Sequence, residues 1–249
     1  SPGRGFLHAS VYCDVGHPTI QARAQVLTDD AASPTDAACR LFRWVRDHIA
    51  FQVGEWNYTA SATLAKGSGT CSNKANLFVA LARASGIPAG FYVQHVRGQE
   101  YLGPIVPGHL RKHLGPRSLH VLAGVYLGER WIRCDPSDDR PFAEATVHLN
   151  PQSRLVEWDG RHDAVLSLDP VHIFDTQGPL THIDDVLGKP ARIRAAIVRV
   201  GNYYIEFLRT HAHEYATQQA LERGFARWLL RAHPRSALDY WAATVWRGR

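Results

Sequence analysis

The chain has 249 residues, of which 45% are hydrophobic and 20% charged, and it carries a formal net charge of +5. This composition is typical of a globular chain that is large enough for one substantial core with a helical extension. No apolar run approaches the roughly 20 residues of a transmembrane helix, so we expect no membrane contact. The 28 Lys and Arg residues are scattered among 23 Asp and Glu, which argues against a nucleic-acid-binding protein.

The four cysteines, Cys13, Cys39, Cys71 and Cys134, follow no metal-ligand spacing. A disulfide framework is unusual in a chain of this size, so reduced thiols and a cytoplasmic location are the simplest expectation. The sequence begins at Ser1 without Met and shows no signal peptide, which leaves an upstream signal open.

The segment before Cys71 predicts a helix and then an irregular stretch. Ser33 followed by Pro34 is typical of a helix start, and apolar residues at helical spacing continue as far as Ile49. Residues 51–63 have no clear period. Because this stretch precedes a cysteine at a glycine-rich turn, we expect it to supply a hydrogen-bond donor or a lid there. The candidate oxyanion and substrate-binding residues are Gln52, Trp56 and Asn57.

A glycine-rich turn then continues as a helix over Ser72–Ser85. The apolar residues of this helix are too dense for a surface position, so it should be buried at the centre of the fold. Thr70 or Ser72 can cap its start, and Gly86 suits its end. Cys71 therefore lies at the helix N-terminus, where free N–H groups and the helix dipole stabilise an anion and lower the thiol pKa.

Strands are predicted to follow this helix. Phe91–Val96 alternates as a sheet strand does, and Ser118–Leu127 and Arg130–Asp135 read as a hairpin around a two-residue Gly-Glu turn. In that register Asp135 lies diagonally within reach of His120 on the same face of the sheet.

A cysteine nucleophile needs a base and a group that orients the base. We therefore predict Cys71 as the nucleophile, His120 as the base and Asp135 as the orienting carboxylate. Neighbouring residues of a strand point to opposite faces, so Cys134 should face away from the site and be inert.

These segments resemble a known family. GTCSNKANLFVALARASGIPAG and SLHVLAGVYLGERWIRCDPSD are similar to the transglutaminase-like cysteine enzyme superfamily over roughly Asp14–Asp139, with Cys71, His120 and Asp135 at its three functional positions. The resemblance implies an α+β fold, with a papain-like core in which the helix that carries the cysteine packs on an antiparallel sheet. It also implies acyl transfer through a Cys71 thioester, from an amide or thioester to water or an amine, without a cofactor.

The second half of the chain completes the predicted architecture. Residues 1–175 should form the catalytic domain, with an edge strand over Val165–Phe174, and residues 176–249 a helical extension packed on it. The predicted helices of the extension are Leu180–Leu187, Ala191–Tyr215, Gln218–Ala232 and Ala237–Trp246. The extension could cap the cleft and set the choice of substrate.

Three functions stay open from the sequence. The first is a thiol protease, another hydrolase or an amide-forming acyltransferase, which acts on a peptide, protein or small-molecule acyl substrate. The second is a non-catalytic transglutaminase-like module that binds peptides or proteins, although such a module has no need of an intact Cys, His and Asp set. The third is a metal enzyme. His109 and His113 have ligand spacing if helical, but Arg111 and Lys112 would repel a cation, so we expect no metal site. The oligomeric state is not predicted.

Overall fold

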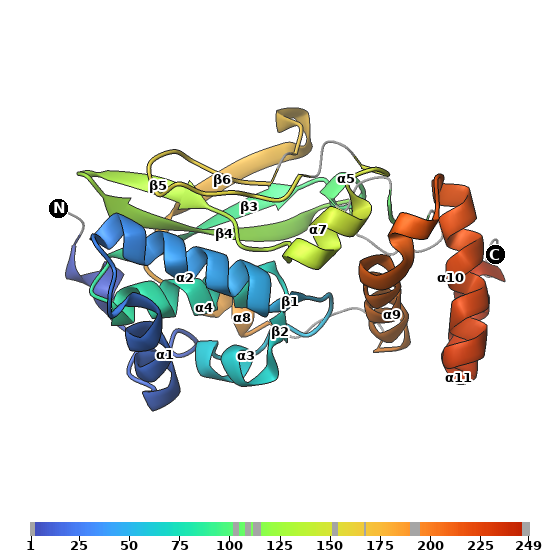
Figure 1. The fold of residues 1–249 in the computed structure, drawn as a ribbon, viewed down its shortest axis with the longest axis horizontal. Helices are drawn as coiled ribbons and strands as arrows, with labels where there is room; N and C mark the ends of the chain where they lie inside the picture. Colours follow the sequence, from blue (N-terminus) through green and yellow to red (C-terminus); the bar gives the residue numbers. More distant parts are fainter. Residues whose placement is uncertain are drawn as a thin grey trace.

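The computed structural model describes residues 3–101, 105–107, 111, 116–150, 154–166, 168–189 and 195–245. At its centre is a four-stranded antiparallel sheet in the order β5-β4-β3-β6. The strands are β3 (Ala89–Val96), β4 (Ser118–Leu127), β5 (Arg130–Cys134) and β6 (Ile173–Leu180). The helices that precede β3 in the chain lie against one face of this sheet (Figure 1). This is the predicted α+β arrangement.

The central helix is α4 (Cys71–Ala84), which packs against β3 and β4. Every residue from Cys71 to Arg83 is buried, because α4 lies between the sheet and the other helices of its layer. The other elements of this part are η1 (Arg4–Leu7), α1 (Pro18–Thr28), α2 (Pro34–His48) and α3 (Ala60–Lys66). Two short strands, β1 (Ala50–Phe51) and β2 (Ser68–Gly69), pair in parallel immediately before α4. The prediction of a buried central helix is confirmed.

The hairpin of β4 and β5 has the predicted register. Leu127 pairs with Arg130, and Ala123 pairs with Cys134. The two turn residues, Gly128 and Glu129, have φ angles of 54° and 64°. Two left-handed residues give the type I′ turn, whose twist matches that of the flanking strands.

The edge strand lies further along the chain than predicted. The expected strand over Val165–Phe174 is wrong for most of its length, because Pro170 begins the short 3₁₀ helix η3 (Pro170–His172) and pairing with β3 starts only at Ile173. Most side chains of β6 are exposed, so the strand shows no alternating hydrophobic pattern that a sequence reading could detect.

The C-terminal helices build a second hydrophobic core, and Figure 1 shows them beyond one end of the sheet, next to α7. The remaining elements are α5 (Gly98–Tyr101), α7 (Arg140–Thr146), α8 (Asp184–Leu187), α9 (Ala195–His211), η4 (Ala212–Glu214), α10 (Gln218–Ala232) and α11 (Pro234–Val245). The first part of the chain contributes Phe51 and Phe142 to this core, and their rings lie 5.8 Å apart.

The prediction of helices for the extension is confirmed for α10 residue by residue, whereas α8 is shorter than predicted. The proposed division at 175/176 stays a prediction. Strand β6 runs across it, and Ile183 and Leu187 belong to the core of the sheet and its helices.

Candidate active site

Cys71 is the first residue of α4, and the turn before it is held in place by a capping box. Thr70 is the N-cap; its side chain accepts the Asn73 N–H, and the Asn73 side chain accepts the Thr70 N–H at 3.1 Å. This reciprocal pair fixes the helix start, so the thiol lies among the free N–H groups of the first turn. Cys71 is 8% exposed, which makes it nearly buried but still accessible.

His120 and Asp135 meet at the open end of the hairpin. The imidazole Nε2 lies 2.6 Å from Asp135 Oδ2, and both side chains are buried. The other carboxylate oxygen accepts the Ser137 N–H at 3.1 Å and the Ser137 hydroxyl. Sequence reasoning missed Ser137, although an Asp-Pro-Ser step is typical of a turn in which an Asp bonds the backbone two residues on.

The Cys71 thiol completes this group, because its ionisation is coupled to that of the His120 side chain. Burial by itself raises the pKa of Cys71, but the hydrogen bond and the charge of His120, with the Val121 N–H, hold that pKa below its ordinary value. Burial disfavours the imidazolium, yet the Asp135 carboxylate and the thiolate raise the pKa of His120 to about 10. Burial also acts to raise the pKa of Asp135, but His120 and Ser137 lower it overall. The arrangement favours a thiolate–imidazolium pair beside a carboxylate.

The other three cysteines lack this environment. Cys134 is fully buried in the core, on the face of β5 opposite to the site, and burial followed by the Asp135 charge raises its thiol pKa well above the ordinary value. Burial likewise raises the pKa of Cys13, to about 12, and that of Cys39. The predicted orientation of Cys134 is confirmed, and only Cys71 has a thiol pKa below its ordinary value.

The three residues predicted to supply oxyanion or substrate contacts have different hydrogen-bond partners. The Gln52 amide oxygen accepts the Ser68 hydroxyl at 3.1 Å, and the exposed Asn57 accepts the Tyr12 hydroxyl at 2.6 Å. The Trp56 carbonyl accepts the Asn73 side chain at 2.8 Å, which ties Trp56 to the first turn of α4. Its indole N–H is buried without a hydrogen-bond partner within the described part of the chain.

Comparison with known proteins finds one family that matches the part of the chain with the candidate site. Residues 21–136, a segment that contains Cys71, His120 and Asp135, match the family model of the transglutaminase-like superfamily. The segment that holds the candidate site is therefore transglutaminase-like. No curated protein matches this chain.

Solved structures similar to this chain include two bacterial proteins. One is a proposed cysteine protease of Cytophaga hutchinsonii, with a TM-score of 0.44, 22% identity, and coverage of 55% of this chain and 43% of that one. The other is a proposed protease of Parabacteroides distasonis, with a TM-score of 0.36, 13% identity, and coverage of 54% of this chain and 25% of that one. The match therefore covers less than half of the length of each of these two bacterial proteins.

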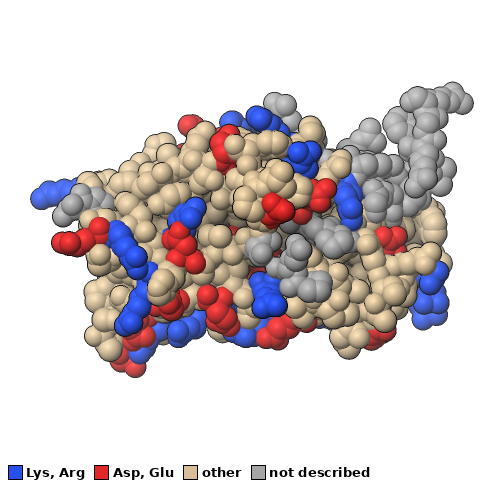
Figure 2. All heavy atoms as spheres, turned by 90° about the horizontal axis from the view of Figure 1, so that it is seen from above, with Lys and Arg blue, Asp and Glu red and all other residues tan. Residues whose placement is uncertain are grey.

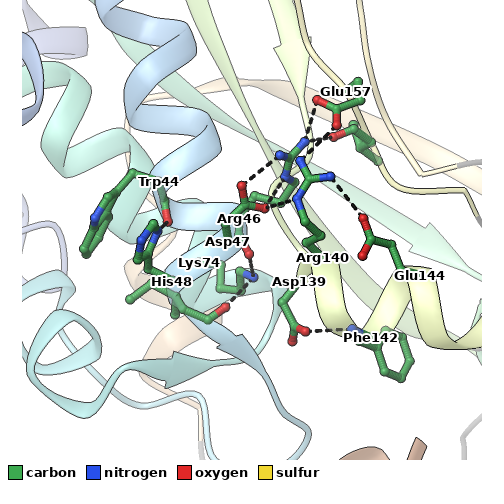
Figure 3. Close-up of polar contacts among 12 residues, drawn as sticks. Trp44, Arg46, Asp47, His48, Lys74, Asp139, Arg140, Phe142, Glu144 and Glu157 are labelled. Carbon is green, nitrogen blue, oxygen red and sulfur yellow. Dashed lines mark hydrogen bonds and ion pairs between the residues drawn. The ribbon is translucent and has the colours of Figure 1, made fainter. Parts of the chain in front are cut away.

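Charged residues that sequence reasoning did not assign surround the transglutaminase-like site. Lys74, one turn along α4 from Cys71, is fully buried, and its Nζ donates to the carbonyls of Arg46 at 3.2 Å and Ile49 at 2.6 Å (Figure 3). Burial lowers the pKa of Lys74 to about 8. Burial and the Asp135 charge raise the pKa of Asp138 to about 7. A lysine inside an apolar helix needs buried hydrogen-bond acceptors. The position of Lys74 among apolar residues is visible in the sequence and could have indicated this.

Among the described residues, no group of three or more His, Cys, Asp and Glu side chains could hold a metal ion. His109 and His113, whose spacing is that of metal ligands, lie outside the described residues. No described helix has the length and apolar character that crossing a bilayer requires. On the face drawn in Figure 2, Lys and Arg side chains lie interspersed with Asp and Glu.

Proposed function

We propose that this protein is a cysteine enzyme that transfers acyl groups through a thioester on Cys71. The observation that supports this proposal is the 2.6 Å hydrogen bond between His120 and Asp135, together with the lowering of the Cys71 thiol pKa by His120. The pKa directions of the three groups match a nucleophile, a base and an orienting carboxylate.

In the proposed reaction, His120 holds the proton of the Cys71 thiol, and the thiolate attacks the carbonyl carbon of an amide or thioester. A carbon–sulfur bond forms, and the carbonyl electrons move to the oxygen of a tetrahedral intermediate. When the bond to the leaving group breaks, His120 donates its proton to that group, and a thioester remains on Cys71. Asp135 keeps the imidazole oriented and stabilises its positive charge. None of these steps needs a cofactor.

The oxyanion of the intermediate needs donors close to the sulfur. The Cys71 N–H at the start of α4 is one candidate. The Trp56 indole is the second, because its N–H is buried without a partner in the described structure and its carbonyl is fastened to Asn73. Gln52 and Asn57 are weaker candidates, since their amide oxygens already accept hydroxyl groups.

The acyl acceptor decides the class of the enzyme. Water gives a hydrolase, of which a peptidase is one case, and an amine gives an amide-forming acyltransferase. The acyl donor is proposed to be a peptide, a protein or a small molecule.

The test uses p-nitrophenyl acetate, an activated ester that reports acylation by release of p-nitrophenolate. The expected result is one acetyl group on Cys71 in intact and peptide mass spectra, with faster loss of the acetyl group when glycine ethyl ester is added as an amine acceptor. Cys71→Ala should take up no acetyl group, and Cys134→Ala should behave as the parent does. Slow acetylation spread over all four thiols would contradict the proposal and favour a binding module.

A further inference from the structure

Helix α9 lies against the chain segment that leads to Trp56. We infer that two of its residues, Asn202 and Arg209, are positioning residues. They hold the segment Phe51–Trp56, which forms the wall of the site against which the acyl group binds. This inference rests on the proposed function, because it concerns the same site. It gives the C-terminal helices a direct part in the reaction.

Asn202 binds the backbone of Val53 with both ends of its amide. Its Oδ1 accepts the Val53 N–H at 2.9 Å, and its Nδ2 donates to the Val53 carbonyl at 3.0 Å. An amide that satisfies the donor and the acceptor of one residue replaces a neighbouring strand at that point. Few side chains other than Asn can do this from a fixed position on a helix.

Arg209 fixes the backbone two residues earlier. Its guanidinium bonds the Asp139 carboxylate, with Nη2 at 2.6 Å from Oδ2, and it also donates to the Phe51 carbonyl. Asp139 accepts the Phe51 N–H at 2.7 Å. It also caps α7 by accepting the Phe142 N–H at 3.0 Å, as Figure 3 shows. Burial raises the pKa of Asp139, but the Arg209 bonds outweigh it and hold that pKa below its usual range. Both polar groups of the Phe51 backbone are therefore engaged by this ion pair.

The helix also approaches this segment too closely for a side chain between them. Gly54 has a φ of +107°, and a Cβ atom there would lie 2.2 Å from Val198 of α9. A Cβ on Gly201 of α9 would lie 3.1 Å from Val53. Glycines on both sides thus permit the contact that the hydrogen bonds require.

The segment held by α9 is fastened to the cysteine turn at its other contacts. The Gln52 N–H donates to the Gly69 carbonyl at 3.0 Å, two residues before Cys71. The Trp56 carbonyl accepts from Asn73 at 2.8 Å. The segment is thus held from two sides, by α9 at Phe51 and Val53 and by the cysteine turn at Gln52 and Trp56. Loss of the α9 anchors would leave the Trp56 indole held from the cysteine turn alone, while the pair of Cys71 and His120 depends on α4 and β4.

This division makes the inference testable, because two reagents report different parts of the site. Alkylation of Cys71 by iodoacetamide depends on the thiolate and hence on His120. Acylation by p-nitrophenyl acetate passes through an oxyanion, so it depends in addition on the hydrogen-bond donors of the Phe51–Trp56 segment. Loss of positioning should lower the rate of acylation much more than the rate of alkylation.

The experiment measures both rates, as a function of pH, for the full chain and for the variants Asn202→Leu, Arg209→Met and Arg209→Lys. The matched control is Arg199→Met, since Arg199 is an arginine of the same helix whose ion-pair partner is Asp239 of α11. For Asn202→Leu and Arg209→Met we expect acylation to slow roughly 10- to 100-fold, as for a small misplacement of a reacting group. Alkylation and its pH midpoint should remain those of the parent. Arg209→Lys should recover part of the loss, and Arg199→Met should match the parent.

Equal losses in both reactions would mean that α9 contributes only stability, and the inference would be overturned. Unchanged acylation in Asn202→Leu and Arg209→Met would overturn it as well. Failure of the parent itself to acylate Cys71 would instead refute the proposed function, so the two ideas fail in different ways. Retained alkylation in each variant shows that the Cys71 environment is folded.

Discussion

Asp135→Asn tests the electrostatic basis of the site, because it removes a charge and changes little else in shape. Asp135 is 1% exposed, and its charge and hydrogen bond are the main causes that raise the pKa of His120 from 6.5 to about 10 against the effect of burial. An opposite charge at this range shifts a pKa by roughly 1–3 units, which corresponds to about 1.4–4 kcal/mol. Without it, the imidazolium loses its proton at lower pH, and the thiolate loses its cationic partner.

The assay is the rate of Cys71 alkylation by iodoacetamide as a function of pH. In the parent the thiolate forms below the ordinary thiol pKa, since the pKa of Cys71 is lowered. In Asp135→Asn the midpoint should move upward by roughly 1–3 pH units, and acylation at neutral pH should slow by about 10²- to 10⁴-fold. Asp163→Asn is the matched control, because Asp163 is a half-exposed carboxylate that pairs with Arg133 at 2.7 Å. An unchanged midpoint in Asp135→Asn would show that another carboxylate, such as Asp138, holds the charge of His120.

Three further changes have defined outcomes. Cys71→Ala should abolish acetyl transfer from p-nitrophenyl acetate and leave the circular dichroism spectrum and melting temperature nearly unchanged, since it removes little buried volume; residual transfer would point to another nucleophile. Cys134→Ala or Cys134→Val should cost about 1–2 kcal/mol of unfolding free energy at most and leave the alkylation rate of Cys71 unchanged. Faster labelling of Cys134 than of Cys71 in the parent would contradict the orientation of β5. Lys74 has a folded-state pKa of about 8 against an ordinary 10.5, so the unfolded chain binds more protons between these values and stability should rise with pH there. Urea unfolding at both ends of this range should show the parent gaining about 3 kcal/mol relative to Lys74→Met, and an equal pH dependence in both proteins would refute the lowered pKa.

The parts of the fold that the sequence predicts are those with strong local signals. Thr70 and the dense apolar residues after it define the start and the burial of α4, and both were predicted. The turn at Gly128 sets the register of the hairpin, and from the register follows the meeting of His120 with Asp135. In each case a few neighbouring residues determine the geometry.

The parts that the sequence does not predict depend on contacts between distant residues. The exposed strand β6 has no hydrophobic pattern, and its backbone pairing with β3 decides its position. Asn202 is an ordinary polar residue in the sequence of α9, and it gains its role only because Val53, 149 positions earlier, lies beside it. The role of Asp139 is hidden in the sequence for the same reason, since its partner Phe51 lies far before it and its partner Arg209 far after it.

The late position of Arg209 in the chain has a consequence for synthesis on the ribosome. Cys71, His120 and Asp135 all leave the ribosome well before α9, whereas the Asp139 carboxylate obtains its guanidinium partner only when residue 209 has emerged. At about 5–20 residues per second, the interval between the nucleophile and this arginine is roughly 7–28 seconds. During that time the nascent chain carries the three side chains of the proposed site, but the backbone of Phe51 and Val53 is not yet anchored by α9. The anchoring of this segment by α9 is therefore completed only after residue 209 has been made, well after the side chains of the proposed site.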